Sequence, residues 1–242
     1  MTVSLSGLRV VLTRPDGASP DVLDELRAAG ADAVNVPLIV IGPPSDGGQA
    51  LQQALVDPSV YEWIIVTSAN GARALRERAG SDRALPKLAA LGAATANALE
   101  MTVAFIPTKA SAHGLADEFD RGTGRVLVIG AQEPSADMSA LLQPKGWTVD
   151  VVAGYATSSN LLDQQDRRQV MAADVVVFAS GSAARSFAEQ RLAGPMSVFV
   201  ALGESTKRVM DELGLHAHAV AQTPSADDVV AAVGEATGRT SP

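Results

Sequence analysis

The strongest constraint in this sequence of 242 residues is an internal repeat. The pattern Ala-Leu-Gly-x-x-Thr occurs at residues 90–95 and again at 201–206, an offset of 111 residues (from 90 to 201). Residues 63–70 match 175–182 at an offset of 112, and residues 9–12 match 125–128 at an offset of 116. Loop insertions between two diverged copies produce small changes of this kind. Because a repeat sets the architecture of a chain, we interpret the sequence as two copies of one unit.

Short apolar runs alternate with helical stretches along both copies. Uninterrupted runs such as 63–66, 125–129 and 175–178 are typical of parallel strands buried on both faces. The pattern predicts an α/β fold with two parallel-sheet domains, each a three-layer unit of the flavodoxin or Rossmann type. The proline-bounded residues 37–44 and the segment around Tyr155 read as extended crossings between the domains.

Composition limits the partners and the compartment. The formal net charge of −8 argues against nucleic acid or an anionic membrane as a partner, because phosphate binding needs a basic face. The chain has no cysteine, which excludes disulfides and thiolate-bound metals and suits a reducing compartment. No apolar run reaches the length of a membrane span or of the hydrophobic part of a signal peptide. We therefore expect a cytoplasmic protein.

Familiar catalytic motifs do not occur in the sequence. It has no phosphate-binding P-loop, no dinucleotide fingerprint after a strand and no nucleophile elbow. Two of the three histidines, His216 and His218, share one predicted strand face, which is too few ligands for a catalytic zinc site. We expect no metal site.

Hydroxyl groups and glycines instead gather where predicted strands give way to helices. In open parallel sheets ligands bind beyond the carboxyl ends of the strands, and the N–H groups of helix starts favour anions. Each residue taken alone is explained at least as well by helix capping, whereas together they predict one anion-binding rim in each domain. Thr95 and Thr206 lie about a turn inside their helices, where threonine has no capping role. The predicted substrate-binding residues are Thr13, Arg14, Thr67, Ser68, Gly92, Thr95, Ser180, Ser182, Gly203, Ser205 and Thr206.

Three further side chains each have two interpretations. Arg73 and Arg185 hold matching positions in first helical turns, where they either bind carboxylates or lie on a solvated helix face. Tyr155 follows a predicted strand within one of the crossings. Its phenol either donates a proton to a ligand or packs as a hinge aromatic.

Taken in order, these segments resemble the uroporphyrinogen-III synthase family along nearly the whole chain. No single piece is specific, whereas their order and spacing are. The resemblance rests on residues 12–15, 63–70, 91–96, 155, 178–183 and 202–206. It implies two α/β domains joined by two extended linkers, with a cleft between the domains. Residues 1–37 and 158–242 would form one domain, residues 45–152 the other, and residues 38–44 and 153–157 the linkers.

The resemblance also implies an activity. Members close the linear tetrapyrrole hydroxymethylbilane to uroporphyrinogen III, with loss of water and inversion of the last pyrrole ring. This is a lyase reaction of haem, sirohaem and cobalamin biosynthesis that needs no metal or organic cofactor. Tyr155 would be the catalytic residue that assists departure of hydroxide, and Thr95 and Thr206 would bind or orient the substrate. Nothing in the sequence suggests an obligate interface, so we expect a monomer, and its substrate could arrive by transient hand-over from hydroxymethylbilane synthase.

One loop departs from the family pattern, and two non-enzymatic interpretations stay open. Many members carry a basic residue in the loop that corresponds to residues 130–134, where this chain has none, so we assign no substrate binding to it. The chain could also be a two-lobe ligand-binding protein, or a regulatory paralogue without activity. The presence of Thr95, Tyr155 and Thr206 argues against the inactive paralogue.

Overall fold

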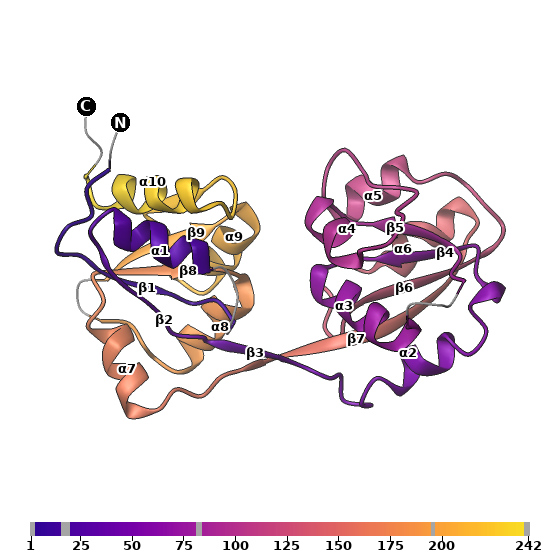
Figure 1. The fold of residues 1–242 in the computed structure, drawn as a ribbon, viewed down its shortest axis with the longest axis horizontal. Coiled ribbons are helices and arrows are strands. Elements are labelled where there is room, and N and C mark those ends of the chain that lie inside the picture. Colours follow the sequence, from indigo (N-terminus) through magenta and orange to yellow (C-terminus); the bar gives the residue numbers. More distant parts are fainter. Residues whose placement is uncertain (1–2, 16–19, 81–83, 195–196, 240–242) are drawn as a thin grey trace. The chain divides into compact units, whose positions relative to one another are not determined.

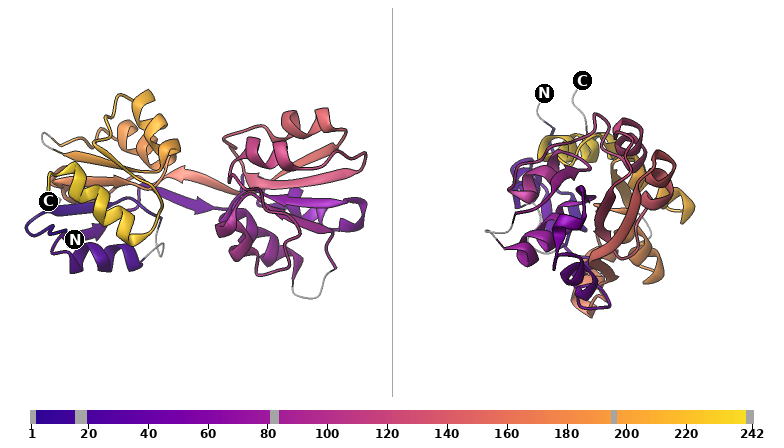
Figure 2. Two further views of the ribbon diagram at one scale, coloured as in Figure 1. Left: turned by 90° about the horizontal axis from the view of Figure 1, so that it is seen from above. Right: turned by 90° about the vertical axis from the view of Figure 1, so that its right-hand side faces the viewer.

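The computed structural model describes residues 3–15, 20–80, 84–194 and 197–239 (Figure 1). The chain forms two compact units: unit 1 is Met1–Val40 with Ser158–Pro242, and unit 2 is Ile41–Thr157. Each unit contains one five-stranded sheet, and Figure 2 shows helices on both sides of each sheet. The predicted α/β class is confirmed. Among the described residues, no helix combines the length and the apolar character needed to span a membrane.

Unit 1 is a parallel sheet with the strand order β10-β9-β8-β1-β2. Its strands are β1 (Arg9–Leu12), β2 (Asp32–Asn35), β8 (Val175–Phe178), β9 (Val198–Leu202) and β10 (Ala219–Ala221). Its helices are α1 (Pro20–Ala28), α7 (Gln164–Met171), α8 (Gly181–Glu189), α9 (Glu204–Glu212) and α10 (Ala226–Ala236).

Alternation along the strands gives unit 1 two cores. Side chains of successive strand residues point to opposite faces of a sheet. Val10 and Leu12 of β1 therefore join the core under α1 and α10, whereas Val11 joins the core under α7, α8 and α9. Strands buried on both faces explain the uninterrupted apolar runs in the sequence.

Unit 2 has the strand order β3-β7-β6-β4-β5, in which β7, β6, β4 and β5 pair in parallel. Its strands are β3 (Ile39–Gly42), β4 (Trp63–Val66), β5 (Lys87–Ala90), β6 (Arg125–Ala131) and β7 (Thr148–Ser159). Its helices are α2 (Gln49–Ala54), α3 (Ala69–Ala79), α4 (Ala93–Leu99), α5 (Ala112–Glu118) and α6 (Met138–Leu142), with 3-10 turns at Pro58–Val60 and Gln143–Lys145. The chain passes from one unit to the other within β3 and within β7.

The sequence repeat reappears in the two sheets as a shared strand order. The repeat relates β1, β8 and β9 of unit 1 to β6, β4 and β5 of unit 2. Unit 1 contains the order β9-β8-β1 and unit 2 the order β5-β4-β6, so corresponding strands have the same neighbours, although β10 lies outside β9 whereas β5 is an edge strand. In both units the central pair joins strands from different copies of the repeat. Each unit is therefore assembled from half of one copy and half of the other.

Candidate functional site

The predicted site residues of unit 1 follow the carboxyl ends of its strands, beginning with Thr13 after β1. Thr13 is fully buried. Its hydroxyl donates to the Val177 carbonyl at 3.0 Å and accepts from the Ala179 N–H at 3.3 Å. The hydroxyl thus joins the ends of β1 and β8 and presents no surface to a ligand. This corrects the expectation of a direct substrate contact, because both hydrogen-bonding roles of the group are taken up by the backbone.

Arg14 is held in place through its backbone. Its N–H donates to Asn35 Oδ1 at 3.1 Å, and Asn35 Nδ2 donates back to the Arg14 carbonyl at 3.0 Å. The guanidinium donates to the Pro224 carbonyl at 3.3 Å, in the loop between β10 and α10. Burial lowers the pKa of the Arg14 guanidinium from its usual value, although arginine stays charged at neutral pH. A half-buried cation therefore stands at the carboxyl edge of this sheet.

The start of α8 combines a capped turn with open donors. Ser180 is the N-cap residue, and its hydroxyl accepts from the Ala183 N–H at 3.2 Å. The N–H groups of Gly181 and Ser182 have no acceptor among the described residues. The Ser182 side chain is exposed. Helix starts of this kind favour negatively charged groups.

The start of α9 places Thr206 in an unusual situation. Gly203 is the N-cap residue with a φ of 84°, a conformation that favours glycine, and Ser205 is exposed. Thr206 is only 3% exposed, and its hydroxyl has no hydrogen-bond partner among the described residues. Among the described residues, every side-chain oxygen or nitrogen that is completely buried has a hydrogen-bond partner. Because the Thr206 hydroxyl has no such partner, its oxygen cannot be completely buried, and the small exposed part of the residue includes this oxygen.

Thr95 repeats this arrangement in unit 2. It holds the same third position of α4, is 6% exposed, and its hydroxyl likewise has no partner among the residues that the structure describes. The N-cap residue of α4 is Gly92, whose backbone is extended. A Cβ at Gly92 would come within 2.9 Å of Ala110 Cβ. The two helix starts therefore require glycine for different reasons: Gly92 for space and Gly203 for its backbone angle. In both helices the threonine holds the third position.

Thr67 and Ser68 follow β4 and serve the fold directly. The Thr67 hydroxyl donates to the Ile129 carbonyl at 3.3 Å, which joins the end of β4 to β6. Ser68 is the N-cap residue of α3 and accepts from the Gly71 N–H at 3.1 Å. Both side chains are half-buried, so each keeps some surface beside its structural contact.

Tyr155 lies in β7 directly after an irregularity in the pairing with β6. Gly130 pairs with Ala153 and Ala131 pairs with Tyr155, so Gly154 is an extra residue in the ladder. A bulge of this type changes which face the following side chains use. Tyr155 is half-buried, and its hydroxyl has no hydrogen bond within the described part of the chain. The phenol is therefore free to meet a ligand.

Two supporting residues were not predicted from the sequence. Asn35 fixes the backbone of Arg14, as described above. Gln132 lies in the loop at residues 130–134, to which we assigned no substrate binding. Its N–H donates to the Tyr155 carbonyl at 2.8 Å, and its Oε1 accepts from the Ser45 N–H at 2.6 Å. The only signal in the sequence is that each amide residue stands at or just after a strand end.

Arg73 and Arg185 each hold the fifth position of their helix and contact a neighbouring polar side chain. Arg73 donates to Asn70 Oδ1 at 2.7 Å, and Arg185 pairs with Glu212 at 3.5 Å. Both side chains are exposed, which agrees with the interpretation as a solvated helix face. Among the described residues, no group of three or more histidines, aspartates and glutamates could hold a metal ion.

Each unit thus has its own set of candidate residues on the carboxyl edge of its sheet. Because the strands are parallel, the residues that follow them meet at one edge. In unit 1 these are Arg14, Ser180, Ser182, Gly203, Ser205 and Thr206, with Thr13 beneath them. In unit 2 they are Thr67, Ser68, Gly92 and Thr95, and Tyr155 lies within β7, paired with Ala131 at the end of β6.

Comparison with known proteins gives one consistent family. A family model described as uroporphyrinogen-III synthase HemD matches residues 21–238. The chain is 29% identical to the uroporphyrinogen-III synthase of Synechococcus elongatus over 162 residues, which are 62% of this chain and 61% of that protein. It is 28% identical over 223 residues to a putative uroporphyrinogen-III synthase of Archaeoglobus fulgidus, covering 87% of this chain and 91% of that protein.

A solved structure has the same fold. The crystal structure of a mutant uroporphyrinogen III synthase from Thermus thermophilus superposes with a TM-score of 0.68 at 15% identity, covering 96% of this chain and all of the other. The match to the family model extends over most of the chain. The resemblance inferred from the order of short segments is therefore confirmed, and the chain belongs to the uroporphyrinogen-III synthase family.

Proposed function

We propose that this chain is a lyase that closes hydroxymethylbilane to uroporphyrinogen III, with loss of water and inversion of the last pyrrole ring. Membership of the family supports the proposal. The observation that carries it is the matched pair Thr95 and Thr206. Both side chains are more than nine-tenths buried, and the described residues give neither hydroxyl a partner. Polar groups that are this buried normally have a hydrogen-bond partner within the fold. Two matched hydroxyls without one are therefore explained better by binding to a ligand.

The proposed substrate suits donors of this kind. Hydroxymethylbilane, the substrate that the family resemblance implies, carries eight carboxylates. The chain itself has a net charge of −8, so long-range electrostatics oppose binding and local donors must overcome this. Open N–H groups at Gly181 and Ser182, the cation of Arg14 and the two threonine hydroxyls supply such donors. We propose that the carboxyl edge of each unit binds some of the carboxylates.

The chemistry proposed for the chain is mainly one of positioning. The terminal hydroxymethyl group leaves as water after protonation, which produces an electrophilic carbon next to its pyrrole ring. Attack on this carbon by the substituted position of the last ring forms a spiro intermediate. The bond from that position to the neighbouring methylene bridge then breaks, the bridge carbon bonds the free position on the other side of the ring, and loss of the proton at that position completes the inverted product. We assign Tyr155 as the donor of the first proton, because its hydroxyl has no partner within the described residues. Holding the last ring in the productive orientation is the task of the binding residues.

The setting of the reaction is also a proposal. We propose that the chain acts in the cytoplasm as a monomer, in tetrapyrrole biosynthesis. Spontaneous ring closure of the bilane gives the other isomer, so a short path from the enzyme that makes it would be an advantage. We therefore retain transient hand-over from hydroxymethylbilane synthase as part of the proposal.

The test is to supply freshly generated hydroxymethylbilane to the purified chain and to separate the oxidised products by chromatography. The proposal predicts the type III isomer, and the same assay on Tyr155→Phe tests the proton donor. Unchanged turnover in Tyr155→Phe would remove that role from Tyr155 and leave the positioning residues in place.

A further inference from the structure

A cavity of about 320 Å³ opens in unit 1 at the amino-terminal side of β1 and β2. Its volume lies at the lower end of the range for small-molecule sites, roughly 300–1,000 Å³. Arg9, which begins β1, lines the cavity, whereas Thr13 and Arg14 follow the other end of the same strand. The cavity is therefore distinct from the candidate residues at the carboxyl edge of this unit.

Four residues in register form the floor of the cavity. In the parallel pair β1 and β2, Arg9 stands opposite Asp32 and Val11 stands opposite Val34. Side chains two residues apart in a strand share a face, so all four lie on one side of the sheet. That side is the one covered by α7, because Val11 belongs to the same core as Val170 of that helix. The floor thus has two charged residues at the strand starts and two valines beyond them.

The roof is a single stripe of α7 and the residue that follows it. Gln165, Arg168, Gln169 and Ala172 line the cavity at intervals of three and four residues, which places them on one helix face. A stripe that faces a sheet is normally apolar. Here three of its four members are long and polar, although they lie above two valines. This mismatch leaves the space between helix and sheet unfilled by apolar side chains.

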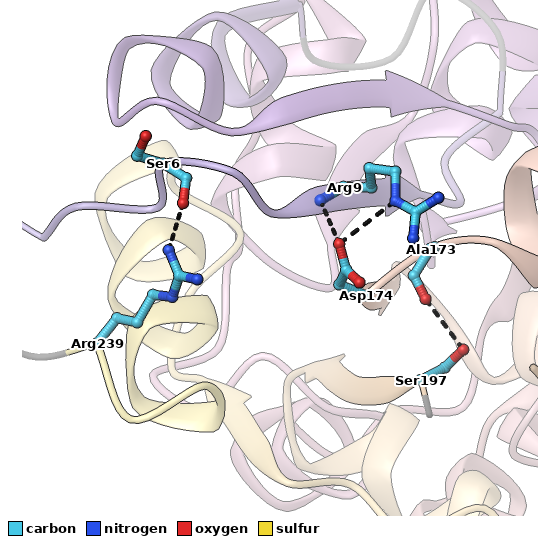
Figure 3. Close-up of polar contacts among 6 residues, drawn as sticks. All are labelled: Ser6, Arg9, Ala173, Asp174, Ser197 and Arg239. Carbon is cyan, nitrogen blue, oxygen red and sulfur yellow. Dashed lines mark hydrogen bonds and ion pairs between the residues drawn. The ribbon is translucent and has the colours of Figure 1, made fainter. Parts of the chain in front are cut away.

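The charged groups that line the cavity keep hydrogen-bonding capacity that the fold does not use, although Arg9 forms one ion pair. Asp174 accepts hydrogen bonds from the Arg9 N–H at 2.8 Å and from Arg9 Nε at 3.5 Å, which orients the Arg9 side chain (Figure 3). The terminal nitrogens of Arg9, the guanidinium of Arg168 and the carboxylate of Asp32 have no partner among the described residues. The lining itself carries two cations and one anion, and Asp174 beside it offsets part of the Arg9 charge.

We propose that this cavity binds a small organic monoanion, with its carboxylate held by Arg9 and Arg168 and its apolar body on Val11 and Val34. Guanidinium groups match carboxylates in geometry and charge. Two guanidinium groups with free terminal nitrogens can hold one carboxylate, whereas Asp32 in the lining and Asp174 beside it disfavour a ligand with many, such as the proposed substrate. The amides of Gln165 and Gln169 can donate to the carboxylate. This site goes beyond the proposed function and does not depend on it.

The test uses hydrocinnamate, which joins one carboxylate to one aromatic ring. The ligand is titrated into the full chain carrying isotope-labelled valine methyl groups, and the Val11 and Val34 signals are followed by NMR. Hydrocinnamamide, with the same body and no charge, and propionate, with the charge and no ring, are the comparison ligands. We expect saturable shifts of both valines with hydrocinnamate, at lower concentration than with either comparison ligand.

Two variants and a matched control locate the binding. Arg168→Gln should weaken hydrocinnamate binding about fivefold, as for one part-exposed charge-assisted contact, and leave the amide unaffected. Arg121→Gln makes the same change at an exposed residue of unit 2 and should leave both ligands unaffected. Ala172→Leu adds volume to the lining and should weaken both the acid and the amide.

Three results would overturn the proposal. They are equal affinity for the acid and the amide, equal effects of Arg168→Gln and Arg121→Gln, and ligand binding that leaves the signals of Val11 and Val34 unchanged. Arg168→Gln should keep the wild-type rate of bilane closure, since Arg168 has no place in the proposed catalytic set. The outcome at this cavity is therefore read separately from the outcome of the activity assay.

Discussion

Asn35 and Arg14 form a reciprocal pair, in which the side-chain amide of Asn35 bonds both the N–H and the carbonyl of Arg14, at 3.1 and 3.0 Å. Arg14 follows β1 and Asn35 ends β2, and these two strands are parallel neighbours. The amide thus continues the backbone ladder by one step after β1 has ended. It fixes the point from which the Arg14 side chain reaches the Pro224 carbonyl.

The first prediction concerns this pair. Asn35→Ala removes both hydrogen bonds, so the backbone of Arg14 loses its anchor while the Arg14 side chain itself is unchanged. If Arg14 binds a substrate carboxylate, we expect KM to rise, with kcat/KM falling about tenfold. Steady-state kinetics with a folding check by circular dichroism measures this. Gln52→Ala, a change of an exposed amide on α2, is the control and should keep wild-type kinetics. An unchanged KM in Asn35→Ala would separate the pair from substrate binding.

The second prediction concerns the hydroxyls of Thr206 and Thr95. Valine has nearly the shape of threonine, and no hydrogen bond within the described residues is lost on replacement. Thr206→Val and Thr95→Val should therefore leave the free energy of unfolding within about 0.5 kcal/mol of wild type. The rate of type III formation should fall about tenfold or more, equivalent to ~1.4 kcal/mol. Thr206→Ser should recover much of the rate, and full activity of both valine variants would argue against a substrate contact.

The third prediction is the reverse of the second and concerns Thr13. Thr13→Val leaves the Ala179 N–H and the Val177 carbonyl without their side-chain partner at a fully buried position. We expect a loss of about 1–3 kcal/mol in the free energy of unfolding, measured by urea denaturation. Stability equal to that of wild type would show that the strand ends of β1 and β8 do not need this hydroxyl.

The fourth prediction concerns the bulge before Tyr155. A Cβ at Gly154 would lie 3.0 Å from Ile129 Cγ2 and 3.2 Å from Ala74 Cβ. Gly154→Ala should cost about 1–3 kcal/mol in stability, and activity should fall because the backbone next to Tyr155 shifts. Gly42→Ala is the matched control, since nothing lies within 4 Å of a Cβ there. Equal stability of the two variants would show that the bulge accommodates a side chain.

The fifth prediction concerns pH and Asp174. Hydrogen bonds from the Arg9 backbone, and then from its side chain, lower the pKa of the Asp174 carboxyl. A lowered pKa in the folded state stabilises the fold above the unfolded value, near pH 4, and this stabilisation is lost as pH falls through the folded value.

Asp174→Asn should therefore cost about 1 kcal/mol or less at neutral pH, because the carboxyl side chain is 40% exposed. The difference from wild type should shrink below about pH 4. Urea unfolding curves at neutral and acid pH provide the comparison. A difference that does not change with pH would contradict the assigned role of the charge.

The fold class could be predicted from the sequence because its signals are local. Runs such as Val175–Phe178 and the glycine turns that follow them identify strands and helix starts without knowledge of their neighbours. The repeat then shows that two sets of such elements exist. Strand order could not be predicted in this way. It depends on which runs pair with each other across long stretches of chain, as β1 does with β8.

The candidate site was predictable at the level of residue position but not of residue role. Thr13 and Thr206 look alike in sequence, each a hydroxyl near a strand end. The Thr13 hydroxyl donates to a strand carbonyl 164 residues away, whereas the Thr206 hydroxyl has no such partner in the described residues. The bulge at Gly154 depends in the same way on register with β6. Roles that depend on distant backbone groups have no local signal in the chain.

The measurement that tests the account most directly is the isomer composition of the product from fresh hydroxymethylbilane. The reaction is run with the chain, with the heat-denatured chain and with no protein, and the oxidised products are separated by chromatography. We predict mainly type III with the native chain and type I in both controls, with the type III fraction reduced in Thr206→Val. Type I alone from a folded native chain would contradict the proposed activity.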